Sequence, residues 1–481
     1  MQIRKEGASK MELYHYRSIE NAIKELEYGT FHFAARNELN DPIEGYVRVF
    51  WQGDKAAWEG MLRNYICSLS EAIDLYLLQG NEDMLYHRTL IIDLNQFDNV
   101  PLGGILKKLG DKFLEDEDVQ KIVTFYGNYG LKVQNEELRF ILRFIHNKAL
   151  VLCIQKCREC KTIPAEEANG LLSIFIGKKT NFPFELMNVC IEDQNLRIVM
   201  AKVAENIIED IYDLHFIRLG LKDETFLYGL RKDENGKNIK EDKISESRQR
   251  RKWMTIAVDF PKVYVNQMMD LVYPESYVVC FSGKNNNSVM WGNYADNHRG
   301  VCLVYETDAE NRMTVKGEKS YTLEAKPVSY GGNIIERNFF ETFGRLTPKQ
   351  IKMWLTGTEE LSSSYKVFNN VEEWRKEYWA AYEAKTYRKL KAWEYENEYR
   401  LALSNTFYNF DKPESRNLKY DPKALKGLIF GINTTEYDKE RIMKKLLEHT
   451  DEYNHLVFYQ AEYDDEKQVI NIREKSLWKL K

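Results

Sequence analysis

The apolar residues in the middle of the chain recur at a different period from those on either side. From residue 58 to residue 217 they recur every three or four positions, as in "EDVQKIVTFYGNYGLKV" and "NEELRFILRFIHNKALVLCIQKC". A helix turns about every 3.6 residues and a strand alternates about every two, so this spacing predicts a mostly helical segment. We expect one break in it, at "CKTIPAEEANG".

The segments on either side of this helical stretch read as mixtures of strands and helices. "LYHYRS" and "TFHFA" alternate like strands, and the helix expected between them begins at the cap Ser18 and ends at Gly29. After residue 253 we expect a helix in "NSVMWGNYADNHRG" that ends at Gly300, and another in "DKERIMKKLLEHT". The strands expected there are "ESYVVCFS", "VCLVYE", "ENEYRLALS", "KGLIFG", "HLVFYQAEY" and "QVINIRE".

These patterns predict an α+β protein whose core domain is split in sequence by a helical insertion. We expect residues 1–57 to form the first part of the core and residues 253–481 the second part. Residues 58–252 form the insertion, which ends in a charged run at 229–252 that we interpret as a linker. The basic "RQRRK" at its end is polar enough to be solvated linker rather than a nucleic-acid site.

Composition narrows the class of protein. The 481 residues carry 69 basic and 74 acidic side chains, a net charge of −5, which argues against a general polyanion binder. The first residues, "MQIRKEGASKMELYHY", lack the apolar stretch of a signal peptide, and no run approaches the about 18 apolar residues of a membrane span. Seven cysteines, an odd number, argue against a disulfide framework. We therefore expect a cytoplasmic protein that does not enter a membrane.

The stretch "EYENEYRLAL" carries the strongest chemical signal. Glu396, Glu398 and Arg400 are spaced two apart, so on a strand their side chains would share one face. Such a row fits an exposed strand with cross-strand ion pairs, unless it borders a binding site.

Four segments in order resemble a bacterial family, Domain of Unknown Function 2971. They are "LYHYRS…GTFHFA…LNDPIEG", "VVCFS…SVMWGNYADNHRGVCLVYE", "KPVSYGG", and "YRKLKAWEYENEYRLAL" followed by "DPKALKGLIFG". The resemblance covers roughly residues 11–50 and 270–475 and leaves out the helical segment between them. Members of this family are often encountered near phage-defence genes, so the resemblance implies a cytoplasmic defence or toxin-like effector.

The first strand and helix, "YHYRSIENAIKELEYGTF", are also similar to those of ADP-ribosyltransferases such as the DNA-modifying DarT group. That resemblance implies a split, mixed sheet and NAD as the co-substrate. It also implies a site to which each of three elements contributes at least one residue. The first element would supply His15 or Arg17, and the middle element Ser282 or Tyr294. A late strand would supply Glu398, with Glu396 beside it as a second candidate catalytic carboxylate. The chain differs from transferases with a Ser-Thr-Ser middle motif, since it has "CFSGKNN" there.

Physical chemistry assigns roles to these residues. Cleavage of NAD at the nicotinamide bond gives the ribose cationic character, which a carboxylate such as Glu398 stabilises. Arg17 fits a bidentate clamp on the diphosphate, although it also fits a brace for the turn at Asn40 and Asp41. His15 fits either a hydrogen bond to the ligand or a buried, satisfied histidine, and Tyr294 either a stacking platform or a core residue.

Metal chemistry is not indicated. Cys153, Cys157 and Cys160 have a spacing found in iron–sulfur enzymes, but they lie in a segment expected to be helical, together with His146. Ligands along one straight helix cannot converge on one ion, so we assign these cysteines a buried apolar role and expect no metal. The chain has no P-loop, no H-E-x-x-H and no G-x-S-x-G motif.

Two functions remain open at this point. The first is an ADP-ribosyltransferase-like effector that binds NAD and modifies a macromolecular acceptor, protein or nucleic acid, or hydrolyses NAD. The second is a non-enzymatic sensor that binds a partner protein of a defence system through the helical insertion. A cleft that holds Arg17, Tyr294 and Glu398 together favours the first.

Overall fold

The computed structural model describes residues 10–41, 43–79, 90–94, 101–175, 183–218, 255–406 and 408–475. The chain forms two compact units, each assembled from separate stretches of sequence. Unit 1 comprises Met1–Val47, Pro274–Ile335 and Trp379–Lys481, and unit 2 comprises Arg48–Tyr273 and Glu336–Tyr378. Within the described ranges, no helix is both long and apolar enough to cross a bilayer.

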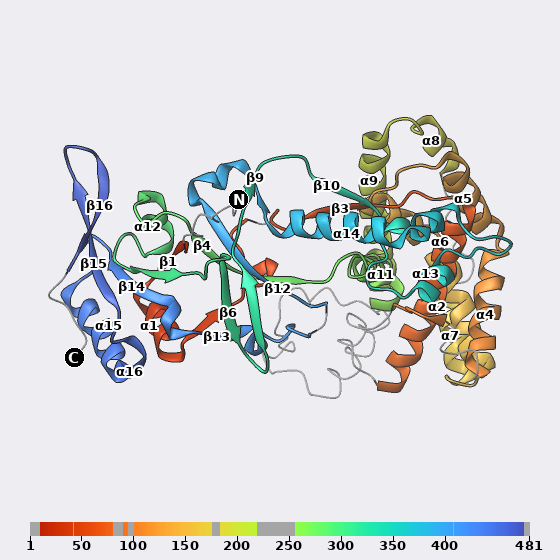
Figure 1. Ribbon diagram of the computed structural model, residues 1–481. Coiled ribbons are helices and arrows are strands. Elements are labelled where there is room, and N and C mark those ends of the chain that lie inside the picture. The colour runs from red at the N-terminus through yellow and green to blue at the C-terminus, as the bar shows by residue number, and fades with distance from the viewer. Residues whose placement is uncertain are drawn as a thin grey trace. The chain divides into compact units, whose positions relative to one another are not determined.

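Unit 1 is built on an eight-stranded sheet in the order β16-β15-β14-β5-β1-β4-β12-β8 (Figure 1). Neighbouring strands of this sheet pair antiparallel, except β14 and β15, which run parallel, so the fold is α+β with a mixed sheet as predicted. The strands are β1 (Glu12–Arg17), β4 (Ser276–Ser282), β5 (Val301–Glu306), β8 (Lys326–Pro327), β12 (Glu398–Ser404), β14 (Leu425–Phe430), β15 (Val457–Asp464) and β16 (Val469–Glu474).

Smaller sheets accompany the large one. A four-stranded sheet has the order β2-β13-β6-β7, from β2 (Thr30–His32), β13 (Asn417–Tyr420), β6 (Arg312–Lys316) and β7 (Ser320–Glu324). Two ribbons pair β9 (Ser329–Tyr330) with β11 (Arg388–Lys389), and β3 (Val47–Phe50) with β10 (Ile335–Asn338). Short 3-10 turns lie at Arg36–Glu38, Phe339–Glu341, Ser363–Asn369, Lys391–Glu396, Pro413–Arg416 and Pro422–Ala424.

Helices cover both faces of the large sheet. On one face α1 (Ile19–Tyr28) packs beside α15 (Glu436–Glu448), with α16 (Thr450–Tyr453) next to α15. Leu13, Leu303 and Leu401 point from the strands into the apolar core on that side. On the other face α12 (Ser288–Tyr294) packs on β1, where Trp291 is fully buried against Tyr16. Alternation along β1 therefore separates Leu13, on the first face, from Tyr16, on the second.

The helix α1 begins and ends as predicted. The Ser18 side chain accepts a hydrogen bond from the amide of Asn21, and Gly29 adopts a left-handed conformation after the last turn. The helix expected at residues 288–300 is shorter than predicted. It is capped by Asn287 but stops at Tyr294. Asp296, Asn297 and His298 then take left-handed backbone conformations, so the predicted end at Gly300 was wrong.

The centre of the sheet contains a fork. β1 pairs with β5 along its whole length, and β4 does the same with β12. Between β1 and β4, however, the ladder holds only one pair, Tyr14 with Ser282. Past that pair the strands separate, and β4 bonds Ala34 instead, through reciprocal hydrogen bonds between Ala34 and Val278. Two central strands that part in this way leave room between their main chains.

Unit 2 is largely helical, which confirms the predicted helical character of the described part of residues 58–217. Helix α6 ends at Glu159 and α7 starts at Ala165, so the break falls where it was expected. The charged run at 229–252, with "RQRRK", lies outside the described residues. The helices are α2 (Lys55–Gln79), α4 (Pro101–Leu114), α5 (Glu117–Tyr129), α6 (Asn135–Glu159), α7 (Ala165–Phe175), α8 (Phe184–Val189), α9 (Gln194–Arg218), a π-helix (Thr255–Asp259), α11 (Phe260–Met269), α13 (Pro348–Trp354) and α14 (Val371–Thr386), whose last residues belong to unit 1.

Candidate functional site

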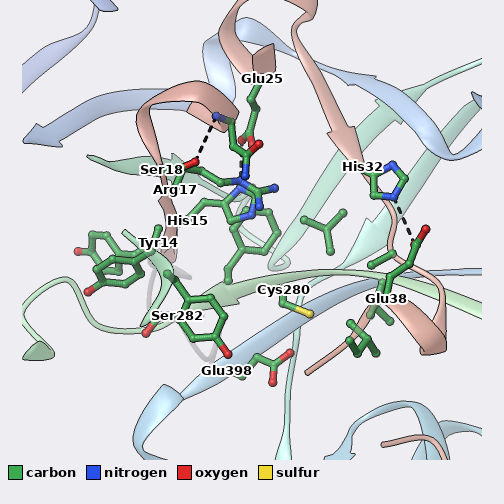
Figure 2. A pocket seen from close by; sticks show the side chains of 18 of the residues that line it. Tyr14, His15, Arg17, Ser18, Glu25, His32, Glu38, Cys280, Ser282 and Glu398 are labelled. Carbon is green, nitrogen blue, oxygen red and sulfur yellow. Dashed lines mark hydrogen bonds and ion pairs between the residues drawn. The ribbon is translucent and has the colours of Figure 1, made fainter. Parts of the chain in front are cut away.

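A cavity of about 1250 Å³ lies at the fork between β1 and β4. Its walls include consecutive residues of both strands, 14–18 and 278–282, so main chain as well as side chains lines it. Successive side chains of a strand point to opposite faces. The cavity is therefore lined from both faces of the sheet. Figure 2 shows the two groups, His15, Arg17 and Glu25 together on one side and Cys280 and Glu398 on the other.

On the first side, a buried carboxylate organises the β1 residues. Glu25 of α1 accepts hydrogen bonds from Arg17 Nε at 2.9 Å and from the Tyr305 hydroxyl at 2.7 Å, and it lies 3.0 Å from His15 Nδ1. Burial alone would raise the pKa of Glu25, but His15, Arg17 and Tyr305 together lower it to about 2. Burial, and then the charge of Arg17, lowers the pKa of His15, so the ring is neutral at pH 7.

Arg17 keeps one edge of its guanidinium open. Only Nε is used by Glu25, and neither Nη group has a hydrogen-bond partner among the residues that the structure describes. The side chain is 27% exposed and lines the cavity. The alternative in which Arg17 braces the turn at Asp41 is wrong, because within the described residues Arg17 bonds Glu25 and not Asp41. Asp41 Oδ1 accepts from the amide of Ile43 at 3.0 Å.

On the second side, Glu398 belongs to a buried ion cluster. Arg400 Nε donates to its Oε1 at 2.7 Å, and Arg400 Nη2 and Lys389 Nζ reach its Oε2 at 3.1 and 3.2 Å. Arg400 also bonds one oxygen of Glu44 and, at 2.7 Å, the carbonyl of Thr386. The other oxygen of Glu44 lies 3.9 Å from Lys389. The exposed ion-pair alternative is thus only half right: the pairs exist, but they are buried.

Glu396 does not lie on the strand, which corrects the prediction of three residues on one strand face. It ends the 3-10 turn Lys391–Glu396, and Asn397, at φ 46°, turns the chain before β12 begins at Glu398. Because the left-handed Asn397 reverses the local direction, Glu396 still reaches the same cluster, where Lys389 Nζ donates to it at 2.5 Å. Glu398 and Arg400 do share a strand face, as expected.

The middle-element candidates both contact the segment that carries Glu396. The Ser282 hydroxyl donates to the carbonyl of Glu396 at 2.7 Å, and the Tyr294 hydroxyl donates to its side chain at 2.5 Å. Asn40, expected only as part of a turn, donates its amide to the Tyr294 hydroxyl at 3.0 Å. The turn itself is present, since the amide of Glu44 bonds the carbonyl of Asp41. Tyr294 is therefore held by its hydroxyl, with its ring half-buried at the cavity.

Burial sets the ionisation of this cluster. It raises the pKa of Glu398 to about 7, against the opposing pull of Lys389 and with a further upward push from the charge of Glu396. Burial likewise raises the pKa of the Cys280 thiol well above its usual range, next to Glu398. Three carboxylates, Glu44, Glu396 and Glu398, face two cations, so the cluster has a surplus negative charge when all are ionised.

The strand register places the two sides of the site. Tyr14 lies opposite Ser282, which lies opposite Glu398, so these three side chains share one face. His15 and Arg17 alternate with Tyr14 and therefore lie on the other face. The predicted catalytic and cofactor-binding residues all line one cavity, which they reach from opposite faces through the fork. Of the two predicted turn residues, Asn40 lines the cavity and Asp41 does not.

The sequence did not point to three charged residues of the candidate site, Glu25, Glu44 and Lys389. Glu25 carried a usable signal, because it stands between the buried Ala22 and Leu26 on the apolar face of α1, where a charge is unexpected. Glu44 and Lys389 lie in the "NDPIEG" and "YRKLKAW" segments, whose spacing to Glu398 along the chain does not reveal that they meet.

Metal binding has no support in the described ranges, where no group of three or more histidine, cysteine or acidic side chains could hold an ion. Cys153 and Cys157 are buried along α6, whereas Cys160 is exposed at its end, so the apolar role assigned to the cysteines holds for two of the three. His146 is buried and bonded to the Tyr65 hydroxyl at 2.7 Å and the Ile256 carbonyl at 2.8 Å.

Comparison with known protein families gives a match for part of the chain. Residues 290–401 match the model of a family described as a protein of unknown function (DUF2971), a span that runs from α12 into β12 and contains Tyr294, Lys389, Glu396 and Glu398. Neither a curated protein nor a solved structure matches the chain. The predicted resemblance to the family DUF2971 is thereby confirmed for residues 290–401, which carry the carboxylate side of the cavity. The rest of the predicted span, residues 11–50, 270–289 and 402–475, lies outside this match.

Proposed function

We propose that the chain binds NAD in the fork cavity and transfers its ADP-ribose to a macromolecule or to water, as ADP-ribosyltransferases do. One observation carries the proposal. His15, Arg17, Ser282, Tyr294 and Glu398, chosen from sequence as a set, line one cavity although they come from three distant parts of the chain. The separation of β1 from β4 also agrees with the split sheet expected from that resemblance.

The first side of the cavity suits a diphosphate. The two free Nη groups of Arg17 present the planar edge that pairs with two oxygens of a phosphate. Lys24, on α1, lines the same side, and the described residues offer its ammonium group no ion-pair partner. Two cations next to an opening between main chains fit the anionic centre of a dinucleotide.

The second side suits a group that is or becomes positive. The surplus negative charge of the Glu44, Glu396 and Glu398 cluster favours the cationic nicotinamide ring and the positive charge that develops on the ribose. The bond between nicotinamide and the ribose C1′ breaks with its electron pair leaving on nicotinamide. C1′ then bonds the acceptor atom, whose proton is released. Glu398 would stabilise the charge at C1′, and Glu396, held by Tyr294, lies beside it.

The biological setting that we propose is that of a bacterial defence effector or toxin. It rests on the family match at residues 290–401 and on what that resemblance implies, since members of the family are often encountered near phage-defence genes. Consumption of NAD or modification of a macromolecule would both suit such a role.

Nicotinamide release from labelled NAD, with and without cell lysate, tests the proposal. We expect Glu398→Gln to lower release by about 10²- to 10³-fold, the usual cost of removing one group that stabilises transition-state charge. The matched control is Glu394→Gln, an exposed carboxylate of the preceding 3-10 turn that pairs only with Lys391 among the described residues. Equal release from the wild type and Glu398→Gln would remove Glu398 from the chemistry.

A second function has one observation in its favour. Both oxygens of Glu398 are already engaged by Arg400 and Lys389, as they would be in a purely structural ion cluster. A non-enzymatic sensor that binds a nucleotide or a partner protein would have such a cluster. Binding of NAD without any release of nicotinamide, in the presence of lysate, would favour this second function over the first.

A further inference from the structure

The carboxylate of Glu25 contacts several polar side chains on the first side of the cavity. It is 5% exposed and has three partners, His15, Arg17 and Tyr305, at 3.0, 2.9 and 2.7 Å. The sequence analysis assigned no role to Glu25. One arginine could be neutralised by a carboxylate without two further partners, so neutralisation alone does not explain this arrangement.

The chain connection explains how Glu25 reaches both β1 residues. Helix α1 follows β1 directly through the cap Ser18, and its buried residues Ala22 and Leu26 turn that helix face toward the sheet. Glu25 lies on the same face, three positions after Ala22. His15 and Arg17, two apart on β1, project toward the helix together.

What Glu25 leaves free is as informative as what it holds. Glu25 accepts a hydrogen bond from Arg17 Nε. Both Nη groups of Arg17, which lines the cavity, have no hydrogen-bond partner among the described residues. The Glu25 carboxylate also contacts Nδ1 of His15, whereas Nε2 of that ring has no hydrogen-bond partner within the described ranges. When Nδ1–H donates to the carboxylate, Nε2 of the neutral ring carries the lone pair and can accept a hydroxyl proton.

We propose that Glu25 is a positioning residue, which orients the Arg17 guanidinium for a phosphate and fixes the His15 ring in the tautomer that accepts from a ligand hydroxyl. The ligand class is a phosphate or diphosphate ester with a neighbouring hydroxyl, and its assignment to NAD rests on the proposed function. Glu25 contacts the two binding residues and not the ligand, so its removal should weaken binding more than it slows the chemical step.

Calorimetric titration with inorganic pyrophosphate and with NAD tests this role on Glu25→Gln. We expect the Kd for both to rise about 10- to 100-fold, by analogy with the loss of groups that orient metal ligands. The KM for NAD should rise with little change in kcat. The matched control is Tyr305→Phe, which removes one hydrogen bond to the same carboxylate but leaves Arg17 and His15 bonded to it. It should change each Kd by no more than a few-fold.

A second measurement uses the ligand-free protein and needs no activity. The ¹⁵N chemical shifts of the His15 ring should show the proton on Nδ1 in the wild type, and a mixture of tautomers in Glu25→Gln. A proton on Nε2 in the wild type, or Kd values unchanged in Glu25→Gln, would overturn the inference.

The two proposals fail separately. If the wild type neither binds NAD nor releases nicotinamide, the proposed function falls, while the ring tautomer and the binding of pyrophosphate still decide the role of Glu25. If the wild type binds NAD and Glu25→Gln binds it equally well, only the positioning role falls. Restored affinity in Glu25→Asp relative to Glu25→Gln would support the positioning role.

Discussion

At the scale of single residues, the site depends on carboxylates that the fold places in opposite electrostatic settings. Glu25 has a pKa lowered to about 2 because three donors outweigh the effect of burial, and it serves as a fixed anion. Glu398 has a pKa raised to about 7, because burial and the nearby Glu396 outweigh Lys389. Two carboxylates on opposite sides of one cavity therefore differ in their readiness to take up a proton near neutral pH.

The raised pKa predicts how activity depends on pH. If ionised Glu398 stabilises positive charge on the ribose, kcat/KM should increase as the pH rises through about 7. Glu396→Gln removes a like charge that raises the pKa of Glu398. The rising part of the plot of kcat/KM against pH should therefore move to lower pH. The measurement is nicotinamide release between about pH 5.5 and about pH 9. A limb at the same pH in Glu396→Gln would contradict the assignment, and Glu394→Gln is the control.

The same pKa also predicts a stability effect of known sign. The folded protein binds this proton more tightly than the unfolded chain, in which the pKa is near its ordinary value of 4.5. The contribution of Glu398 to stability should therefore be present below about pH 4.5 and be lost as the pH rises toward 7. Glu398→Gln should flatten this part of the Tm-against-pH curve. A curve of unchanged slope in the variant would count against the raised pKa.

At the scale of elements, local patterns predicted the structure well where each segment carries its own signals. The cap at Ser18, the left-handed Gly29 and the alternation in β1, β4 and β12 all follow from neighbouring residues. The end of α12 was mispredicted because nothing local to Tyr294 marks a stop. A close approach from another part of the chain requires the turn: a Cβ on Gly300 would lie 2.1 Å from the carbonyl oxygen of Arg17.

The turn between Glu396 and Glu398 gives an element-scale prediction. Asn397 has φ 46°, a conformation that costs most residues about 1–2 kcal/mol but glycine almost nothing. Asn397→Ala should therefore lower the thermal midpoint more than Asn397→Gly does. It should also lower nicotinamide release if Glu396 and Glu398 have the proposed catalytic roles, because both carboxylates adjoin this residue. Equal midpoints for the two variants would show that the left-handed turn is not retained in solution.

At the scale of the whole molecule, the sequence predicted an α+β fold with a mixed sheet and a helical region, both of which the structure has. It did not predict that residues 336–378 belong to the same compact unit as the helical region, because periodicity does not encode long-range partners. The fork was missed for the same reason. Among the described residues, β1 and β4 pair only at Tyr14 and Ser282, because Ala34 pairs with Val278 further along β4.

The fork also predicts where a ligand should protect the chain from hydrogen exchange. The main chain of residues 14–18 and 278–282 lines the cavity, so NAD should slow amide exchange there. Helices α2 and α6 of unit 2, which do not line the cavity, are the internal control. Protection confined to unit 2 would place the ligand elsewhere and would exclude the fork as its binding site.

The most direct measurement is an experimental structure of the full chain with a non-hydrolysable NAD analogue. We predict ligand density in the fork between β1 and β4, with diphosphate oxygens on the Nη groups of Arg17 and the nicotinamide ribose beside Glu398. Density for the analogue at another site, with the Arg17 and Glu398 sides of the fork empty of ligand, would contradict the proposed use of this cavity.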